Sequence, residues 1–308
     1  MESSEIYYVK QQFVLGAYKS VLDTPLPDEN SPDYTAALLY KARSHIALND
    51  PQSALKIIPA GSENVALKAV ASLARYIAGK DDTSKEAALE ELRDLSVEIE
   101  DEVEGTEREK ALVRVLAGTA FARAGELEEA LETLGTETED LEAVAVIVQL
   151  YLSINRADLA KKQFERSKRW ADDDLLLQLI ESNIGLATGK DGYSNSSSFY
   201  TEQLANPSLS SPHLLTARGV TRLLRNEIQE AKSDLEESLQ QNKNDPETLA
   251  AFVVAGGLGA LKREETEEYW TQLTSKYPDH PLVTDVTTKA ESFDELLAKL
   301  TVPPPISV

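Results

Sequence analysis

The chain has 308 residues, and 53 Asp and Glu against 31 Lys and Arg give it a formal net charge of −22 at pH 7. This charge would repel phosphate backbones, so we expect no nucleic-acid partner. The sequence has no cysteine, which excludes disulfides and thiolate metal sites. No apolar run reaches the roughly 20 residues of a membrane span. The first residues also lack the basic start and apolar stretch of a signal peptide, so we expect a cytoplasmic protein.

Apolar residues recur with a helical period along the chain, and Gly, Pro, Asn and Asp separate the helical stretches. In chain order this pattern predicts eight helix pairs: 3–14 with 17–23, 33–48 with 51–58, 63–79 with 84–99, 107–124 with 127–134, 140–154 with 157–169, 173–188 with 194–205, 212–225 with 228–242, and 246–260 with 264–276. A last helix over 282–300 is expected to cap the final pair, because a terminal unit otherwise leaves its apolar face in water. Residues 301–308, with three prolines, are expected to form a flexible tail.

The pairs share one arrangement, in which a turn residue is followed five positions later by a small residue of the second helix. The clear copies are Gly16…Val21, Asn49…Ala54, Gly125…Ala130, Asn155…Ala160, Asp191…Ser196 and Asn226…Ala231, and weaker ones are Thr83…Ala88 and Leu261…Thr266. The small residues lie 33, 34, 42, 30, 36, 35 and 35 positions apart. A period of about 34 residues is typical of tetratricopeptide repeats. We therefore predict an all-α fold, a right-handed α-solenoid of about eight degenerate tetratricopeptide-like repeats that runs as one continuous unit over 1–281.

Each position of the pattern has a physical reason. The turn needs a left-handed residue, which Gly adopts freely and Asn or Asp tolerate. The small residue lies where two helix axes cross, and a large apolar residue four positions later fills the space between repeats. The first repeat has Pro25 at that place, so its second helix should be short. The 42-residue interval coincides with an acidic run near 98–109, which we interpret as an insertion between repeats.

The first helices of such a solenoid line its concave surface, and their inward positions form a candidate partner-binding groove. Counting back from the turns places these residues there: Ile6, Phe13, Leu39, Arg43, Ile46, Val115, Ala122, Gln149, Leu152, Val220, Leu223 and Leu258. The lining is mainly apolar, which favours a groove filled permanently by an extended or hairpin segment of a partner. The alternative, that neighbouring helices bury these positions as core, stays open. Only Lys10 and Arg43 are cationic, too few for a clamp around an acidic C-terminus.

Catalytic chemistry has little support in the sequence. The three histidines, His45, His213 and His280, lie far apart in a linear array, so a shared site is not expected. Carboxylate pairs are common in any acidic helical protein. We predict a binding protein rather than an enzyme, with no catalytic residue, cofactor or metal.

Several stretches resemble one known family in order and spacing. Residues 245–259 (DPETLAAFVVAGGLG) resemble the HPETL-x-N-LVVLSQHLG region of the coatomer epsilon subunit family. Residues 277–283 (YPDHPLV) and 289–296 (KAESFDEL) look like the ending of that family. Residues 141–150 (LEAVAVIVQL) and 156–162 (RADLAKK) are similar to an earlier stretch of it, and 9–18 to its start.

This resemblance implies a non-catalytic structural subunit of the COPI vesicle coat. The family subunit binds and stabilises the C-terminal domain of the alpha-coatomer subunit, and the coat acts in Golgi-to-ER retrograde and intra-Golgi transport. It implies a peripheral component of Golgi membranes and COPI-coated vesicles that reaches the membrane only indirectly, through the coat. The alternative is a tetratricopeptide-like adaptor of the membrane-fusion machinery, similar to the SNAP proteins.

Overall fold

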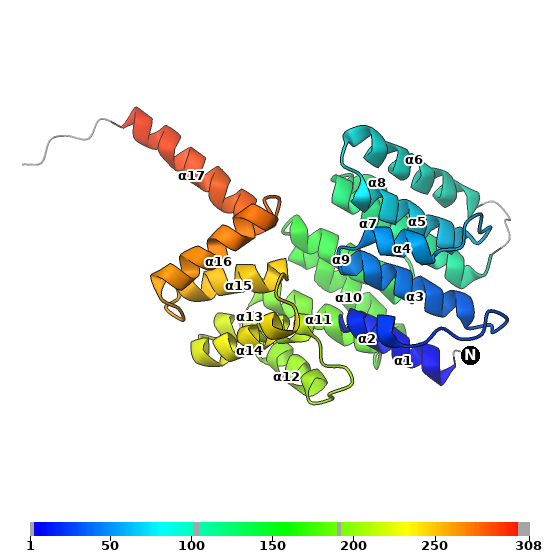
Figure 1. Ribbon diagram of the computed structural model, residues 1–308, viewed down its shortest axis with the longest axis horizontal. Helices are drawn as coiled ribbons and strands as arrows, with labels where there is room; N and C mark the ends of the chain where they lie inside the picture. Colours follow the sequence, from blue (N-terminus) through cyan, green and yellow to red (C-terminus); the bar gives the residue numbers. More distant parts are fainter. Residues whose placement is uncertain (1–2, 101–104, 190–191, 301–308) are drawn as a thin grey trace, which may run out of the picture. The chain divides into compact units, whose positions relative to one another are not determined.

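The computed structural model describes residues 3–100, 105–189 and 192–300, and within these ranges it contains seventeen helices and no strand (Figure 1). The chain forms two compact units, Met1–Leu214 and Leu215–Val308. The predicted all-α solenoid of helix pairs is thereby confirmed, with every predicted helix present.

The helix boundaries lie within about three residues of the predicted ones. The first unit contains α1 (Ser4–Val14), α2 (Tyr18–Asp23), α3 (Tyr34–Ala47), α4 (Pro51–Ile57), α5 (Val65–Ala78), α6 (Asp82–Glu98), α7 (Glu107–Ala124), α8 (Leu127–Leu134), α9 (Leu141–Ser153), α10 (Ala157–Ala171), α11 (Leu175–Thr188) and α12 (Gly192–Leu204). Helix α13 (Pro212–Leu224) begins there and continues into the second unit, which also contains α14 (Ile228–Gln241), α15 (Pro246–Gly257), α16 (Arg263–Lys276) and α17 (Pro281–Lys299).

The turns between paired helices use the left-handed backbone that the sequence pattern requires. Asn49, Asn155 and Asn226 have φ angles of 58°, 58° and 63°, and Gly125 has 85°. The weaker copies differ: Thr83 lies inside α6, and the left-handed residue before α16 is Gly259 rather than Leu261, because glycine reaches this conformation without a Cβ clash. The turn residue Asp191 lies outside the described residues.

The small residues of the second helices lie at helix crossings, as predicted. Ala54, Ala130, Ala160 and Ala231 are completely buried. A Cβ on Gly118, in a first helix, would lie 2.5 Å from Leu134 Cγ, so the two helices of this repeat approach too closely for a side chain there. The short second helix of the first repeat is also confirmed, since α2 has six residues.

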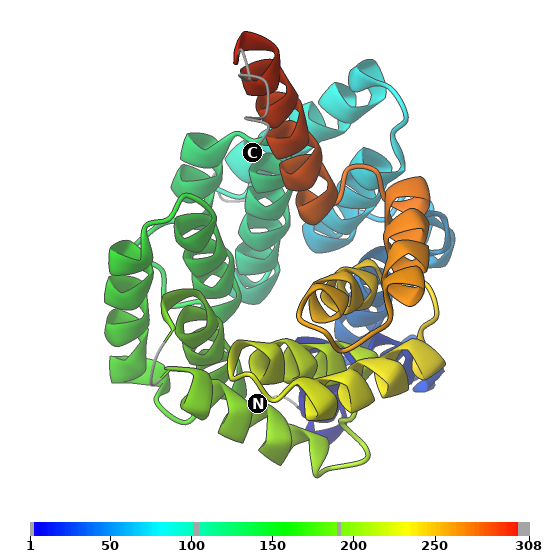
Figure 2. The same ribbon diagram turned by 90° about the vertical axis from the view of Figure 1, so that its left-hand side faces the viewer.

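Buried apolar side chains form a chain of cores between successive helices. In the first unit the largest core runs from α3 to α9, and a second joins α9 to α11. Figure 2 shows α9, α10 and α11, in green, packed against one another. The second unit has its own cores around Leu235 with Phe252 and around Leu249 with Leu273.

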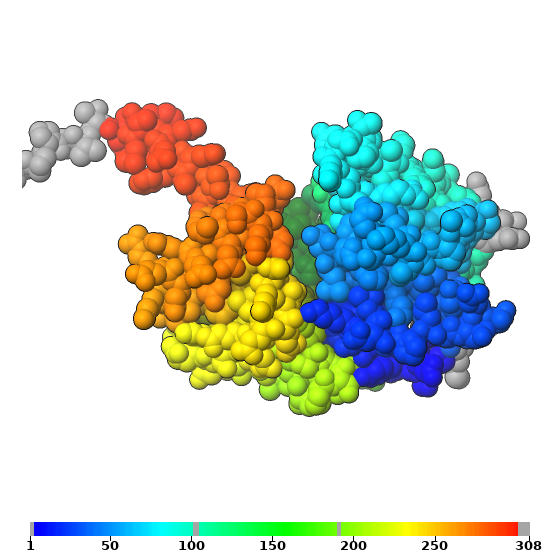
Figure 3. All heavy atoms as spheres, in the orientation of Figure 1, coloured from blue at the N-terminus to red at the C-terminus, as the bar shows by residue number. Residues whose placement is uncertain are grey.

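Only the first turn of α17 packs against the last repeat. Val283 is 7% exposed and packs with Leu249 and Leu273, and Leu282 is partly buried beside it. Every residue from Thr284 to Leu300 is exposed, including the apolar Val286, Phe293, Leu296, Leu297 and Leu300. Figure 3 shows α17, in red, projecting beyond α15 and α16. The expected flexible tail over 301–308 lies outside the described residues.

None of the helices in the described ranges combines the length and the apolar character needed to cross a membrane.

Candidate partner-binding cavity

A cavity of about 680 Å³ opens on the inner side of the first unit. Its walls come from α1, α3, α7, the start of α9, the end of α10 and the start of α11. Five first helices (α1, α3, α7, α9 and α11) therefore contribute to one concavity.

Apolar side chains form the walls of this cavity at mid-helix. Ile6 from α1, Leu39 from α3 and Val115 from α7 line it, and each is less than 7% exposed. Their buried sides belong to the cores between helices. Each of these residues is thus a core residue that also presents part of its surface to the cavity.

A buried ion pair joins two walls. The Arg43 guanidinium of α3 donates a hydrogen bond to the Glu142 carboxylate in the first turn of α9, and their side chains are 11% and 20% exposed. Burial raises the pKa of a carboxyl group, but the charge and hydrogen bond of Arg43 outweigh it and hold the pKa of Glu142 below its usual value. The pair is therefore ionised at neutral pH.

Aromatic rings hold Arg43 in place. Its guanidinium carbon lies 4.5 Å from the ring centroid of Phe13 and 5.7 Å from that of Tyr40. The two rings are 5.4 Å apart and tilted against each other. Cation–π contacts of this kind are strengthened by burial, so Arg43 is fixed as part of the cavity wall rather than free to reach a ligand.

The lining is more charged than the sequence pattern suggested, with six carboxylates against three cations, a formal charge of −3. Much of the acidity comes from helix N-termini. Asp140 and Asp174 cap α9 and α11 through their side chains, and Glu109 closes the capping box of α7 with Thr106. Burial and the charge of Glu142 raise the pKa of Asp140. These acidic groups stabilise helix starts and line the cavity at the same time.

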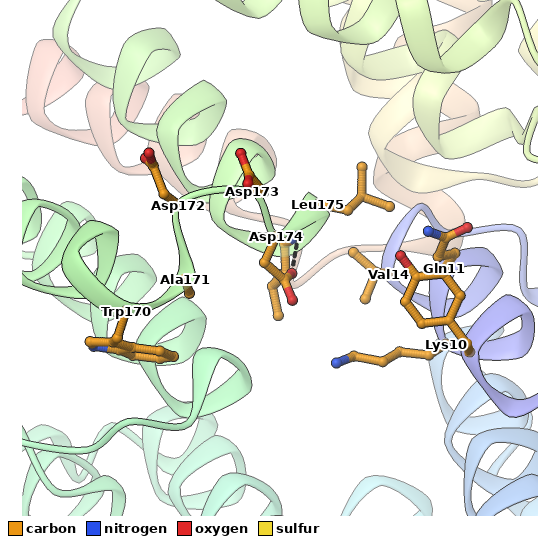
Figure 4. A pocket seen from close by; sticks show the side chains of 11 residues that line it. Lys10, Gln11, Val14, Trp170, Ala171, Asp172, Asp173, Asp174 and Leu175 are labelled. Atoms are coloured by element: carbon orange, nitrogen blue, oxygen red, sulfur yellow. Dashed lines mark hydrogen bonds between the residues drawn. The ribbon is translucent and has the colours of Figure 1, made fainter. Parts of the chain in front are cut away.

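A second, smaller cavity of about 390 Å³ lies between α1 and the connection of α10 to α11 (Figure 4). Lys10 extends from α1 into the space between the two walls, and Trp170 and Asp174 face that space from the other side. Both cavities share Lys10 and Trp170. Trp170 is 37% exposed, so a large aromatic surface is available at the mouth of both.

The structure brings four of the twelve predicted groove residues around the large cavity: Ile6, Leu39, Arg43 and Val115. Five others of the first unit do not line it. Phe13, Ile46, Ala122 and Leu152 are partly buried against neighbouring cores, and Gln149 is exposed.

In the second unit, Val220 and Leu223 pack in the core around Leu235, whereas Leu258 is 54% exposed. The role of all twelve residues in partner binding stays a prediction.

Sequence reasoning did not single out Trp170, Tyr40 or Glu142. Trp170 ends a second helix, and counting inward positions on first helices cannot reach it. The acidic first turn of α9 is visible in the sequence, but its pairing with Arg43, 99 residues away, depends on how the repeats stack.

The comparison with protein families decides the identity of the chain. The family described as coatomer epsilon subunit matches residues 2–301. The chain belongs to the coatomer epsilon subunit family. The resemblance inferred from 245–259 and the other stretches is thereby confirmed, and the chain is assigned as a subunit of the COPI coat.

Curated coatomer epsilon proteins match nearly the whole chain. Coatomer subunit epsilon-1 of Arabidopsis thaliana is 27% identical over 95% of this chain and 96% of its own length. Coatomer subunit epsilon of Caenorhabditis elegans is 23% identical over 96% and 98%. The probable coatomer subunit epsilon of Schizosaccharomyces pombe is 23% identical over 95% and 94%. These relatives favour the coat interpretation over the fusion-adaptor alternative.

Solved structures confirm the type of repeat. A tetratricopeptide repeat protein from Parabacteroides merdae superposes with a TM-score of 0.56 at 15% identity, covering 80% of this chain and 95% of that one. The anaphase-promoting complex assembly Cut9–Hcn1 gives 0.58 at 13% identity over 92% of this chain and 54% of that one. At these identities the likeness concerns the fold alone.

Proposed function

We propose that this coatomer epsilon chain binds and stabilises the C-terminal domain of the alpha-coatomer subunit, and that the cavity of the first unit receives a segment of that domain. In this role it is a non-catalytic, peripheral component of the COPI coat on Golgi membranes and vesicles. It serves Golgi-to-ER retrograde and intra-Golgi transport.

The observation that carries this proposal is the cavity itself. Its volume of about 680 Å³ accommodates several side chains. Its walls combine apolar side chains with the Arg43–Glu142 ion pair. Arg43 and Glu142 already hold each other, so these two side chains lose little conformational entropy when a partner binds. The exposed ring of Trp170 at its mouth is of the residue type that most often dominates interface energies.

Filling the cavity tests the proposal. Ala111 lines it on α7 and is partly exposed, so an Ala111→Trp chain would occupy the space without replacing a core side chain. Ala124, exposed at the end of the same helix and absent from the lining, provides the matched control Ala124→Trp. Calorimetry with the recombinant alpha-coatomer C-terminal domain should show a one-to-one complex for the parent and the control.

We expect Ala111→Trp to lower the affinity at least about 30-fold, the effect of losing about 2 kcal/mol. The absence of any complex with the parent chain would overturn the proposed partner. Equal affinities for both tryptophan variants would overturn the cavity as its site.

A further inference from the structure

A single hydroxyl joins two helix ends that are 196 residues apart in the sequence. Ser211 Oγ donates a hydrogen bond of 2.8 Å to the carbonyl of Leu15, the residue that ends α1. The same oxygen accepts a bond of 3.1 Å from the backbone N–H of Leu214, in the first turn of α13. Leu15 and Ser211 are each 1% exposed. One hydroxyl thus donates a hydrogen bond to a free carbonyl at the end of α1 and accepts one from a free N–H at the start of α13.

Neighbouring residues extend this contact. Gly16 has a φ of 73°, and a Cβ built on it would lie 2.7 Å from His213 Cβ, so the two segments approach closely at a left-handed glycine. The hydroxyl of Tyr8 donates to the carbonyl of Ser208 at 3.3 Å. We call the contact of Tyr8, Leu15 and Gly16 with residues 208–213 the clasp. All of its residues belong to the first unit.

The clasp holds one wall of both cavities. Helix α1 supplies Ile6 and Lys10 to the large cavity, and Lys10 and Val14 to the small one. The opposite wall of the small cavity is the connection from α10 to α11, which Figure 4 shows facing α1 across the open space. The clasp ties α1, which supplies one wall of both cavities, to residues 208–213.

Helix α1 has a second, stronger attachment that does not involve the clasp. Ile6 and Val9 share a buried core with Val21, Ala37 and Tyr40 of α2 and α3. The clasp depends instead on polar contacts and close backbone packing, and a hydrogen bond in a protein contributes about 1 kcal/mol net. The clasp can therefore open while α1 stays packed on α3.

We propose that the clasp gates the cavity: it opens to admit the partner segment and closes to retain it. This inference rests on the proposed function, because it assumes that the cavity receives a segment of the alpha-coatomer C-terminal domain. Loops and hinged elements gate binding sites in this way when a small contact holds them closed. The clasp then affects both the association rate and the dissociation rate of the bound segment.

A reversible disulfide across the clasp tests whether it gates the cavity. The sequence has no cysteine, so Gly16→Cys with His213→Cys introduces a unique pair. Disulfides span Cβ–Cβ distances of about 3.5–4.5 Å, so the segments must separate by about 1 Å to form the bond. The oxidised and reduced forms of this variant are then compared by stopped-flow binding to the alpha-coatomer C-terminal domain, with each single-cysteine variant under both conditions as control.

We expect oxidation before mixing to slow association at least about tenfold, and oxidation of the preformed complex to slow dissociation by a similar factor. Reductant should restore both rates, and the single-cysteine controls should not respond. Rates that are equal in the oxidised and reduced forms would overturn the gate while leaving the proposed partner intact. A reduced form and a parent chain that both fail to bind would overturn the proposed function itself.

Ser211→Ala provides an independent test that needs no disulfide. It removes the hydroxyl that closes the clasp, so we expect dissociation to be at least about fivefold faster, the effect of losing about 1 kcal/mol. Thr221→Ala is the matched control, since its hydroxyl bonds only within α13 to Ala217. Circular dichroism establishes that both variants are folded. Identical dissociation rates for folded Ser211→Ala and the parent would contradict the gate.

Discussion

Arg43 and Glu142 meet in the wall of the cavity although 99 residues separate them in the sequence. The contact joins the second repeat to the fifth, so it depends on how the repeats between them stack. A buried ion pair of this kind gives little net stability compared with apolar side chains, but each partner depends strongly on the other.

Removing one partner should therefore cost much more than removing both. We expect Glu142→Leu to lower the free energy of unfolding by about 3 kcal/mol, because it leaves Arg43 charged and unpaired in a largely buried site. The double variant Arg43→Met with Glu142→Leu should lie within about 1 kcal/mol of the parent.

Urea unfolding followed by tryptophan fluorescence measures this difference. The chain has two tryptophans, Trp170 and Trp270, so a Trp270→Phe background reports on the first unit alone. Equal losses in the single and double variants would show that the pair is not coupled.

The pH dependence of stability should have opposite signs at two neighbouring carboxyls. The pKa of Glu142 is held low, so its contribution to stability is present above 4.5 and is lost as the pH falls through its folded pKa. The pKa of Asp140 is raised by burial and by Glu142, so its contribution is present below 3.8 and is lost as the pH rises through its folded pKa.

Asparagine keeps the helix-capping acceptor of Asp140 without the charge. We therefore expect Asp140→Asn to be more stable than the parent at neutral pH, with a gain that shrinks toward pH 3.8. Glu142→Gln should be less stable than the parent, with a deficit that shrinks as the pH falls below 4.5. Unfolding curves over this pH range measure both, and slopes of the same sign would refute the assignment.

Close packing of paired helices predicts opposite effects of one substitution at two glycines. Gly118→Ala should destabilise the first unit by about 1–3 kcal/mol, because the new methyl group would lie 2.5 Å from buried Leu134 Cγ. Gly257→Ala meets nothing within 4 Å and should be neutral or stabilising by up to about 1 kcal/mol. Thermal unfolding followed by circular dichroism measures both, and a stabilising Gly118→Ala would show that the repeat is less tightly packed than described.

Trp170 should dominate the affinity for the partner while contributing little to stability. We expect Trp170→Ala to weaken binding of the alpha-coatomer C-terminal domain about 30-fold, since an exposed aromatic anchor of this kind is worth about 2 kcal/mol. Val97→Ala, at an apolar position on α6 that is 66% exposed and outside the cavities, serves as control. Calorimetry with both variants decides, and a change below about twofold at Trp170 would remove it from the interface.

The repeat could be predicted because its determinants are local. A left-handed asparagine and a small residue five positions later fix one turn and one helix crossing, and Asn155 with Ala160 suffice to place α9 and α10. The cavity could not be predicted in the same way. Whether Val115 faces a cavity or only a core depends on the curvature that accumulates over several repeats.

The charged residues of the cavity lining could not be predicted from the sequence for a similar reason. Asp140 and Asp174 are recognisable in the sequence as helix caps, and that local role gives no hint that parallel first helices bring their N-termini to one cavity. The clasp could not be predicted either, because its two segments are 196 residues apart in the sequence.

Helix α17 is held at one end and uncovered along the rest of its length. Its 19 residues span about 28 Å at 1.5 Å per residue, and its first turn is fixed by Val283 in the core and by His280, which caps it through Nδ1. The rest of α17 can therefore pivot about its first turn, which the last core of the second unit holds in place. A rotation of about 10° at Val283 would carry Leu300 through roughly 4 Å, so a slight rearrangement in the final repeat becomes a larger displacement of the apolar far end of α17.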